Sequence, residues 1–182
     1  MTMKKWTGCA CVLSALTVLA AWNLNGPAAA GKEGSKPADD PAIERTRDTV
    51  RMLDDIYKTA VVLITDKYVH EETDFAAGSA AVALFDAIKK KGWHEVRLLD
   101  ATGEPYDDEN TPRDDFDRAA VKALKAGKTW FERVERRKDG RFLRVATPIP
   151  VVMKKCVMCH PHYAQAKPGE PIGLLSYTVP VR

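Results

Sequence analysis

The chain has 182 residues, with 28 basic and 25 acidic side chains and a net charge of +3. It contains no run of basic residues of the kind that contacts phosphates, so we expect no nucleic-acid partner. Only four cysteines occur, which argues against the disulfide framework of a small secreted scaffold.

The first thirty residues have the three parts of a secretory signal peptide. Lys4 and Lys5 provide the positive charge, an apolar run extends from Val12 to Trp22, and small residues lead to a cleavage site near Ala30. The apolar run is shorter than the ~20 residues that a membrane-spanning helix needs. We therefore expect an exported, periplasmic protein with no stable membrane anchor after cleavage; an uncleaved N-terminal anchor is the alternative.

Residues 31–41 are small, polar and proline-bearing, which predicts a flexible leader. The remaining residues, 42–182, suffice for one domain with one core, and they contain no visible internal repeat.

A long helix is predicted at the start of this domain. Asp40 and Pro41 suit its cap and first turn. From Ile43 to Tyr68, apolar residues recur at steps of three, four or seven, and the pattern fades at residues 69–71. The apolar face can pack on the core, which is the first expectation, or form the interface of a homodimer.

The next segment is predicted to form a helix, a strand and a loop. The helix is expected from a capping residue, Ser79, to a stop at Gly92, and the strand from Val96 to Leu99. Residues 104–110 are acidic but lack the residue spacing of calcium-binding loops, so a solvated loop is expected.

A third helix and a hairpin follow. The helix is predicted to begin at a capping box, Thr111 to Asp114, with proline at its first position, and to stop at Gly127. Strands at 130–136 and 141–151 flank Asp139-Gly140, which is a strong hairpin signal.

The end of the chain completes the predicted sheet. Pro148 and Pro150 restrict the end of the second hairpin strand to a sheet edge. A last strand alternates between apolar and other residues from Leu175 to Val181. The order of elements predicts an α+β domain in which helices cover one side of an antiparallel sheet.

The motif with the clearest chemistry is Cys156-Val-Met-Cys-His160, the Cys-x-x-Cys-His signature of c-type haem attachment. Two thiols one helical turn apart can each add to a vinyl group on one edge of a porphyrin, and the next residue carries an imidazole to the iron. We therefore predict one covalent haem c, with thioethers at Cys156 and Cys159 and with His160 as the proximal iron ligand. The other two cysteines, Cys9 and Cys11, lie in the signal peptide.

Two other chemistries fit the cysteine pair less well. Structural zinc needs four ligands, usually with histidines well separated from the cysteines, and only His70, His94 and His162 are available besides His160. A thioredoxin-type dithiol opens a helix after the first strand of a βαβ unit, whereas this pair follows the third predicted strand.

Three stretches around the motif carry a family resemblance: residues 92–97 (GWHEVR), residues 146–149 (ATPI) leading into the motif, and residues 167–173 (KPGEPIG). With these, the chain resembles the bacterial mono-haem c-type cytochromes with a PAS-like fold, a family long catalogued as a domain of unknown function. The resemblance covers about residues 43–181. It implies a long N-terminal helix, a PAS-like sheet, a haem between the sheet and the helices, and a role in redox sensing or electron transfer.

The resemblance leaves the second iron ligand open. A cyanobacterial member of that family places a cysteine on the distal side of the iron, and the corresponding place here falls near residues 76–79, where no strong ligand occurs. His70, at the end of the long helix, is a possible distal ligand, and an open or water-bound position is equally expected. The other distal candidates are His94, His162, Met153 and Met158. Aromatic residues expected to line the haem pocket are Phe85, Trp93, Trp130, Phe142 and Tyr163.

Three functions follow from this choice of ligand. Two strong protein ligands would make the protein a periplasmic electron carrier with a redox partner protein, which is the first expectation. An open position would make it a sensor of redox state or of a diatomic gas such as nitric oxide or carbon monoxide. A small haem peroxidase comes third, because no distal acid–base pair is evident, and we do not expect an enzyme.

Overall fold

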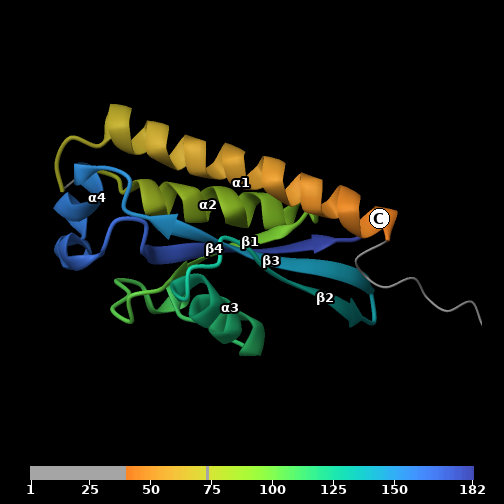
Figure 1. The fold of residues 1–182 in the computed structure, drawn as a ribbon. Coiled ribbons are helices and arrows are strands. Elements are labelled where there is room, and N and C mark those ends of the chain that lie inside the picture. The colour runs from red at the N-terminus through yellow and green to blue at the C-terminus, as the bar shows by residue number, and fades with distance from the viewer. Residues whose placement is uncertain (1–39, 73) are drawn as a thin grey trace, which may run out of the picture. The chain divides into compact units, whose positions relative to one another are not determined.

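The computed structural model describes residues 40–72 and 74–182 (Figure 1). The predicted signal peptide and nearly all of the predicted leader therefore lie outside the described residues. The helices are α1 (Pro41–Tyr68), α2 (Ala77–Lys90), α3 (Asp115–Lys125) and α4 (Lys154–Cys159). The strands are β1 (Glu95–Asp100), β2 (Phe131–Arg137), β3 (Gly140–Pro150) and β4 (Pro171–Pro180).

The four strands form one antiparallel sheet in the order β1-β4-β3-β2. The last strand of the chain therefore lies inside the sheet, and β1 forms one edge. The α+β class, the long N-terminal helix, the PAS-like antiparallel sheet and the position of the motif before the last strand are all as predicted from the sequence.

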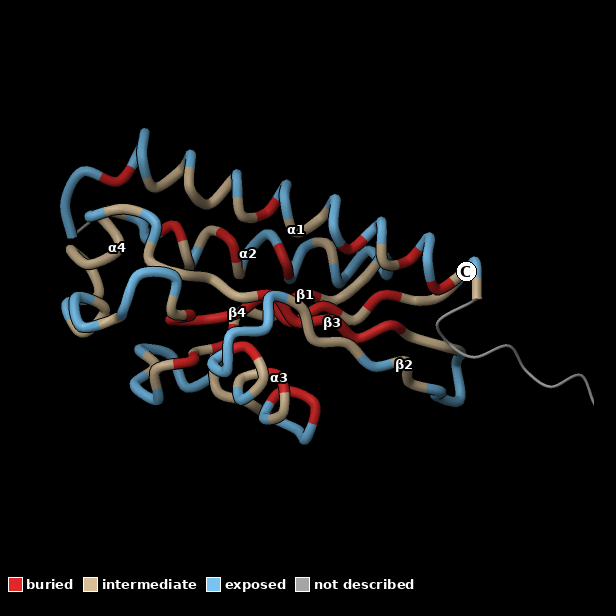
Figure 2. Tube along the Cα trace, in the orientation of Figure 1, coloured by how far each residue is buried: buried red, intermediate tan, exposed pale blue. Residues whose placement is uncertain are grey.

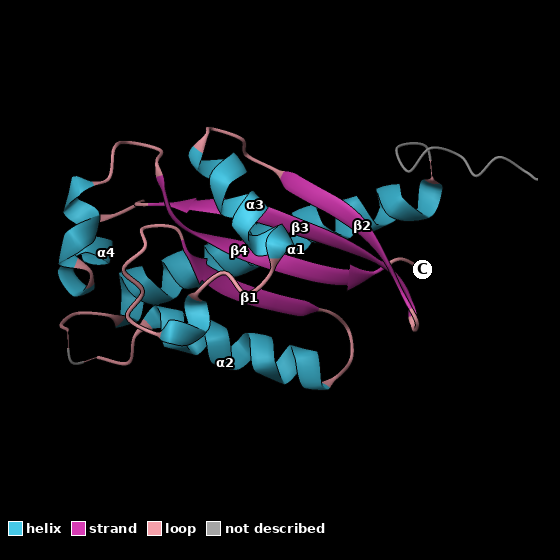
Figure 3. Cartoon of the chain, turned by 90° about the horizontal axis from the view of Figure 1, so that it is seen from below, coloured by secondary structure: helices cyan, strands magenta, loops and turns pink. Residues whose placement is uncertain are grey.

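Helices cover both faces of the sheet, so the prediction of helices on one side only was wrong. Figures 1 and 3 show α1 and α2 on one face and α3 on the other. The reason lies in β4, where neighbouring residues point to opposite faces. Leu175 packs in the core with α1 and α2, whereas Leu174 packs with α3, and both are buried. An apolar residue on each face requires a cover on each face.

The long helix α1 begins as predicted, because the Asp40 carboxylate accepts a hydrogen bond from the backbone N–H of Ala42 (2.9 Å). Ile43, Val50 and Tyr57, seven residues apart, are buried against the sheet, and Figure 2 shows the buried positions of α1 on that side. The predicted apolar stripe ends earlier than expected, since Tyr68 is 75% exposed.

The starts of α2 and α3 differ from the prediction. Helix α2 begins before Ser79, and its cap position, Ala76, offers no side-chain hydrogen bond. Helix α3 begins at Asp115, because the carboxylate of Asp114 caps it by accepting from the N–H of Asp117 (2.9 Å). Asp114 therefore acts as the cap, a role that the predicted capping box gives to Thr111, and its pairing with Arg144 holds it there.

The prolines of β3 lie where the prediction requires. Strand β2 begins at Phe131, which pairs with Ala146, so β3 beyond that point has β4 as its neighbour on one side only. Pro148 and Pro150 fall in this stretch, where a missing N–H donor removes no bond to β2. From there the chain leaves the sheet and enters α4.

Candidate functional site

The motif forms a short helix and its C-terminal cap. Cys156 and Cys159 lie one turn apart on α4, and neither thiol is in a disulfide. The backbone N–H of His160 donates to the carbonyl of Cys156 (3.2 Å), which closes the helix. The 3-10 helix η3 (Pro161–Gln165) then turns the chain back. Local structure alone thus places the two sulfur atoms on one side of the helix and brings the imidazole immediately after them.

Lys155 attaches this helix to the end of α1. Its ammonium group donates to the backbone carbonyls of Thr65 (3.3 Å), Asp66 (2.8 Å) and Val69 (2.7 Å). These carbonyls belong to the last turn of α1, which has no further N–H groups of its own to bind them. A positive charge at a helix C-terminus is also favourable for the helix dipole. The motif is therefore held against the end of the long helix.

A pocket of about 710 Å³ opens beside the motif. Its walls include Ala76 and α2 as far as Asp86, the end of β1, residues 105–107, and the start of β4. The motif contributes Cys159 and His160, and η3 contributes Tyr163. The volume lies within the range of pockets that enclose a drug-sized ligand or cofactor.

The imidazole of His160 lies between two tyrosine rings. Its centroid is 4.6 Å from that of Tyr163, nearly parallel at 15°, and 4.5 Å from that of Tyr106, tilted by 31°. Its Nδ1 atom is buried and has no hydrogen-bond partner among the described residues, and the same holds for Nε2 of His162. Burial, and then the neighbouring His162, lower the pKa of His160, which favours the neutral imidazole.

These residues fit a covalently attached haem. Metal binding requires a neutral imidazole, and the shift in the pKa of His160 favours that form. The tyrosines contact the faces of the ring, so a ring edge remains available to a metal. Both thiols are half-buried and unpaired, and Cys159 lines the pocket, while Cys156 stands one turn away. Both are therefore free to bind the edge of a porphyrin.

The other predicted iron ligands lie outside the pocket lining. His70 is exposed, and its backbone N–H donates to the carboxylate of Asp74 (2.6 Å). His94 is half-buried, where its Nε2 pairs with the hydroxyl of Tyr57 (2.9 Å) and burial lowers its pKa. His162 adjoins His160 with ring centroids 5.8 Å apart, on the same side as the motif. Met153 and Met158 lie at the start of α4 and within it, and neither lines the pocket.

Of the five aromatic residues expected to line the haem pocket, Tyr163 does so and the other four do not. Tyr163 lines the pocket, and burial raises its pKa to about 12, so its hydroxyl stays protonated and is a poor iron ligand. Phe85 is part of the core under α1 and α2, and Trp93 is 60% exposed. Trp130 donates from its indole N–H to Glu132, and Phe142 lies under the guanidinium of Arg137. These four side chains do not line this pocket.

Tyr106 and the first turn of α2 line the pocket but were not predicted from the sequence. Tyr106 lies in the acidic segment that was expected to be a solvated loop, and no local pattern shows that this loop folds onto the motif. The α2 wall carries small residues, Ala76, Gly78, Ser79 and Ala83, which make a weak signal. The one sequence feature that pointed to this wall was the position of residues 76–79, which corresponds to the place of the distal iron ligand in a member of the resembled family.

Gly173 keeps the edge strand close to the pocket wall. A Cβ atom at this position would lie 2.9 Å from the carbonyl oxygen of Leu99, a distance that side chains do not tolerate. Glycine therefore allows β1 and β4 to approach each other where both line the pocket. This explains one residue of the stretch 167–173 on which the family resemblance depends.

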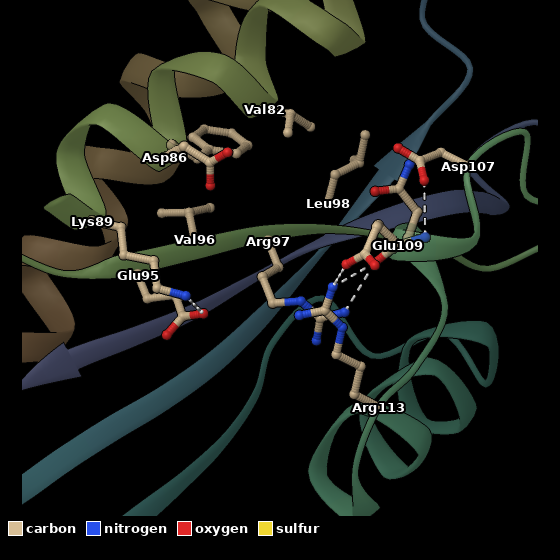
Figure 4. Close-up of a pocket in the computed structure, with 12 residues that line it drawn as sticks. Val82, Asp86, Lys89, Glu95, Val96, Arg97, Leu98, Asp107, Glu109 and Arg113 are labelled. Atoms are coloured by element: carbon tan, nitrogen blue, oxygen red, sulfur yellow. Dashed lines mark hydrogen bonds and ion pairs between the residues drawn. The ribbon is translucent and has the colours of Figure 1, made fainter.

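A smaller pocket of about 190 Å³ adjoins the first along β1 (Figure 4). Two ion pairs lie in its wall: Lys89 with Glu95, and Arg113 with Glu109. Arg97 is bound by Asp117 and by the carbonyls of Glu109 and Thr111.

No described helix is long and apolar enough to cross a membrane, and the described residues contain no cluster of three or more His, Cys, Asp or Glu side chains arranged for a metal ion.

The comparisons with known proteins agree with the fold. A family model described as Tll0287-like matches residues 36–180. The crystal structure of the cyanobacterial heme-protein Tll0287 superposes with a TM-score of 0.57 over 78% of this chain and 96% of that one, at 14% sequence identity. No curated protein sequence matches the chain. Because the family model spans most of the sequence, the chain belongs to the Tll0287-like family, and the resemblance inferred from its motifs is confirmed.

Proposed function

We propose that the chain binds one haem c covalently, with thioethers from Cys156 and Cys159 and with His160 as the proximal ligand of the iron. The observation that carries this proposal is the position of the motif in the wall of a pocket of cofactor size. The imidazole there is stacked, is buried at Nδ1 and makes no side-chain hydrogen bond to a described residue. The solved structure with the same fold is that of a heme-protein, which supports the same conclusion.

The haem, when bound, supplies an iron centre that exchanges an electron or binds a small ligand. Each thioether forms when a thiol adds across a vinyl group, with its hydrogen going to carbon, so the attachment needs no oxidant. The chain contributes the imidazole and a pocket whose apolar wall includes Val82, Leu98 and Ile172.

We further propose that the iron keeps one side open and binds a neutral diatomic such as nitric oxide or carbon monoxide, in the manner of a gas or redox sensor. Among the described lining residues, Cys159 and His160 alone carry a thiol or an imidazole, and methionine and lysine are not represented. The small side chains of α2 leave room for a diatomic ligand. This lining favours a gas-binding role over a carrier with two strong ligands.

Periplasmic electron transfer is the second candidate. It is supported by the half-buried thiols at one end of the fold, since a porphyrin held there would have an edge near solvent for a redox partner protein. A peroxidase has the least support, because the described lining offers neither a second histidine nor an arginine as the distal acid–base group.

The haem itself is tested by a pyridine haemochrome assay on protein produced with a haem-attachment system. We expect the spectrum of a haem with two thioether bonds, and its loss in the Cys156→Ala/Cys159→Ala double variant. A wild-type protein without covalent haem would contradict the proposal.

The open side is tested by absorption spectra of the holoprotein, oxidised and reduced, with and without carbon monoxide. We expect a high-spin or water-bound ferric spectrum and a shift of the ferrous spectrum on adding the gas. A low-spin spectrum that is indifferent to carbon monoxide would favour the electron carrier. His70→Ala should leave both spectra unchanged, and a change would assign His70 as the distal ligand.

Export is tested separately. We expect mature protein in the periplasmic fraction, with a mass that corresponds to an N-terminus near Gly31. Full-length protein retained in the membrane fraction would instead support the uncleaved anchor.

A further inference from the structure

We infer that Tyr106 is a positioning residue, which together with Tyr163 clamps the imidazole of His160 and thereby sets how firmly that histidine holds the haem iron. This inference rests on the proposed role of His160 as the proximal ligand. It adds a residue from a distant part of the chain to the site, and it explains why an exposed loop folds onto the motif.

The two tyrosines lie on opposite faces of the imidazole. Each ring centroid lies about one stacking distance from His160, 4.5 Å for Tyr106 and 4.6 Å for Tyr163. The tyrosines do not form a ring pair with each other, as they would if both were on the same face. His162 contacts both tyrosines from the side, at 5.3 Å and 4.4 Å, so the clamp is closed at one edge.

Stacking replaces the usual means of orienting a metal-binding histidine. Such a histidine generally donates its second N–H to a carbonyl or carboxylate, which fixes the rotation of the ring. Here the Nδ1 atom of His160 is buried and has no acceptor among the described residues. Contact with both faces restricts the same rotation and leaves the edge of the ring free to meet the iron.

The two halves of the clamp are not equivalent. Tyr163 follows His160 within η3, so local structure places it there. Tyr106 arrives from the segment between β1 and α3 and remains 67% exposed, although its ring is stacked. Its hydroxyl has no hydrogen bond to a described residue, so the ring itself makes the contact. Tyr106 can therefore be altered without disturbing the core.

The experiment uses the holoprotein and measures, by electron paramagnetic resonance, the ratio of five-coordinate to six-coordinate ferrous nitrosyl haem. Nitric oxide weakens the bond on the opposite side of the iron, so this ratio reports how firmly His160 is held. An aromatic pair contributes about 0.5–1.5 kcal/mol, so Tyr106→Ala should raise the ratio about two- to tenfold. Tyr106→Phe keeps the ring and should stay near the wild-type value.

Tyr68→Ala is the matched control, because Tyr68 is an equally exposed tyrosine with no ring contact to His160. It should leave the ratio unchanged. An unchanged ratio in Tyr106→Ala would overturn the inference, as would equal increases of the ratio in the Phe and Ala variants. A wild-type protein that is already fully five-coordinate would overturn it too, since His160 would then not be held.

The haemochrome assay on the same samples separates this inference from the proposed function. Protein without covalent haem contradicts both. Protein with covalent haem and no nitrosyl adduct contradicts the open iron position, but leaves the covalent haem standing. Protein with normal haem and a normal nitrosyl adduct, but no effect of Tyr106→Ala, contradicts the clamp alone.

Discussion

On the α3 face of the sheet, the carboxylate of Asp117 is fully buried and is surrounded by donors. It accepts from the guanidinium groups of Arg97 (2.6 Å) and Arg144 (2.9 Å), from the backbone N–H of Arg113 (3.1 Å) and from the hydroxyl of Ser176 (3.3 Å). At the end of the fold that carries the motif, buried polar atoms lack such partners. Nδ1 of His160 and Nε2 of His162 are buried beside a pocket, and neither has a partner among the described residues.

The contrast separates a structural cluster from a binding site. A buried polar group without a partner is costly, so most such groups in folded proteins are paired. At Asp117 the pairing joins α3 to four other parts of the chain, and Nε of Arg144 is the one buried side-chain atom of this cluster without a partner. At the motif the missing partners coincide with a pocket of cofactor size. The unpaired nitrogen atoms therefore adjoin a binding site, whereas Asp117 belongs to a structural cluster.

The largest expected effect is at the paired cluster. Asp117→Asn removes the buried negative charge that pairs with both Arg97 and Arg144, and Arg97 then has no carboxylate partner among the described residues. Removing one partner of a buried ion pair costs about 3–5 kcal/mol, so the free energy of unfolding should fall by about that amount in urea titrations.

Asp115→Asn, in the same helix but with an exposed carboxylate, is the control and should change stability by less than about 0.5 kcal/mol. Equal effects of the two substitutions would mean that Asp117 is not the structural centre described above. The haem content of the folded fraction should be normal in both variants.

A smaller loss is expected where the motif meets α1. Lys155→Met removes the ammonium group from three carbonyls at the end of α1 and should lower the free energy of unfolding by about 1–2 kcal/mol. Lys154→Met is the matched control, since Lys154 is exposed and has no hydrogen bond to a described residue. If both variants had the same stability as the wild type, the attachment of the motif to α1 would not contribute.

The smallest effect is expected at His94. Its ring has one hydrogen-bond partner, so it lies between Asp117, which has several, and Nδ1 of His160, which has none among the described residues. Burial lowers the pKa of His94 from 6.5, so below that pH the unfolded chain binds a proton that the folded chain resists. The free energy of unfolding of the holoprotein should therefore decrease as the pH falls below about 6.5.

In His94→Phe this decrease should be shallower, as measured by urea titrations at a series of pH values. His70→Gln changes an exposed histidine and should keep the wild-type slope. A steeper slope in His94→Phe would contradict the sign of the effect.

Much of this molecule follows from local sequence patterns. Seven-residue spacing of Ile43, Val50 and Tyr57 predicted α1, and Asp139-Gly140 predicted the hairpin, because both depend on neighbours along the chain. The haem motif was recognised in the same way, since the spacing of Cys156, Cys159 and His160 is itself the signal. The predicted starts of α2 and α3 were wrong, because several residues near 79 and 111 could serve as caps.

The sequence by itself determined the fold class, the family and the residues proposed to attach the haem. Tertiary structure alone decided that helices cover both faces of the sheet, that Asp117 is a buried centre of charge, and that Tyr106 closes on His160. The physical reason is distance along the chain. Periodicity, capping and motif spacing act within a few turns, whereas a pocket is made by segments that meet only when the sheet and its helices have assembled.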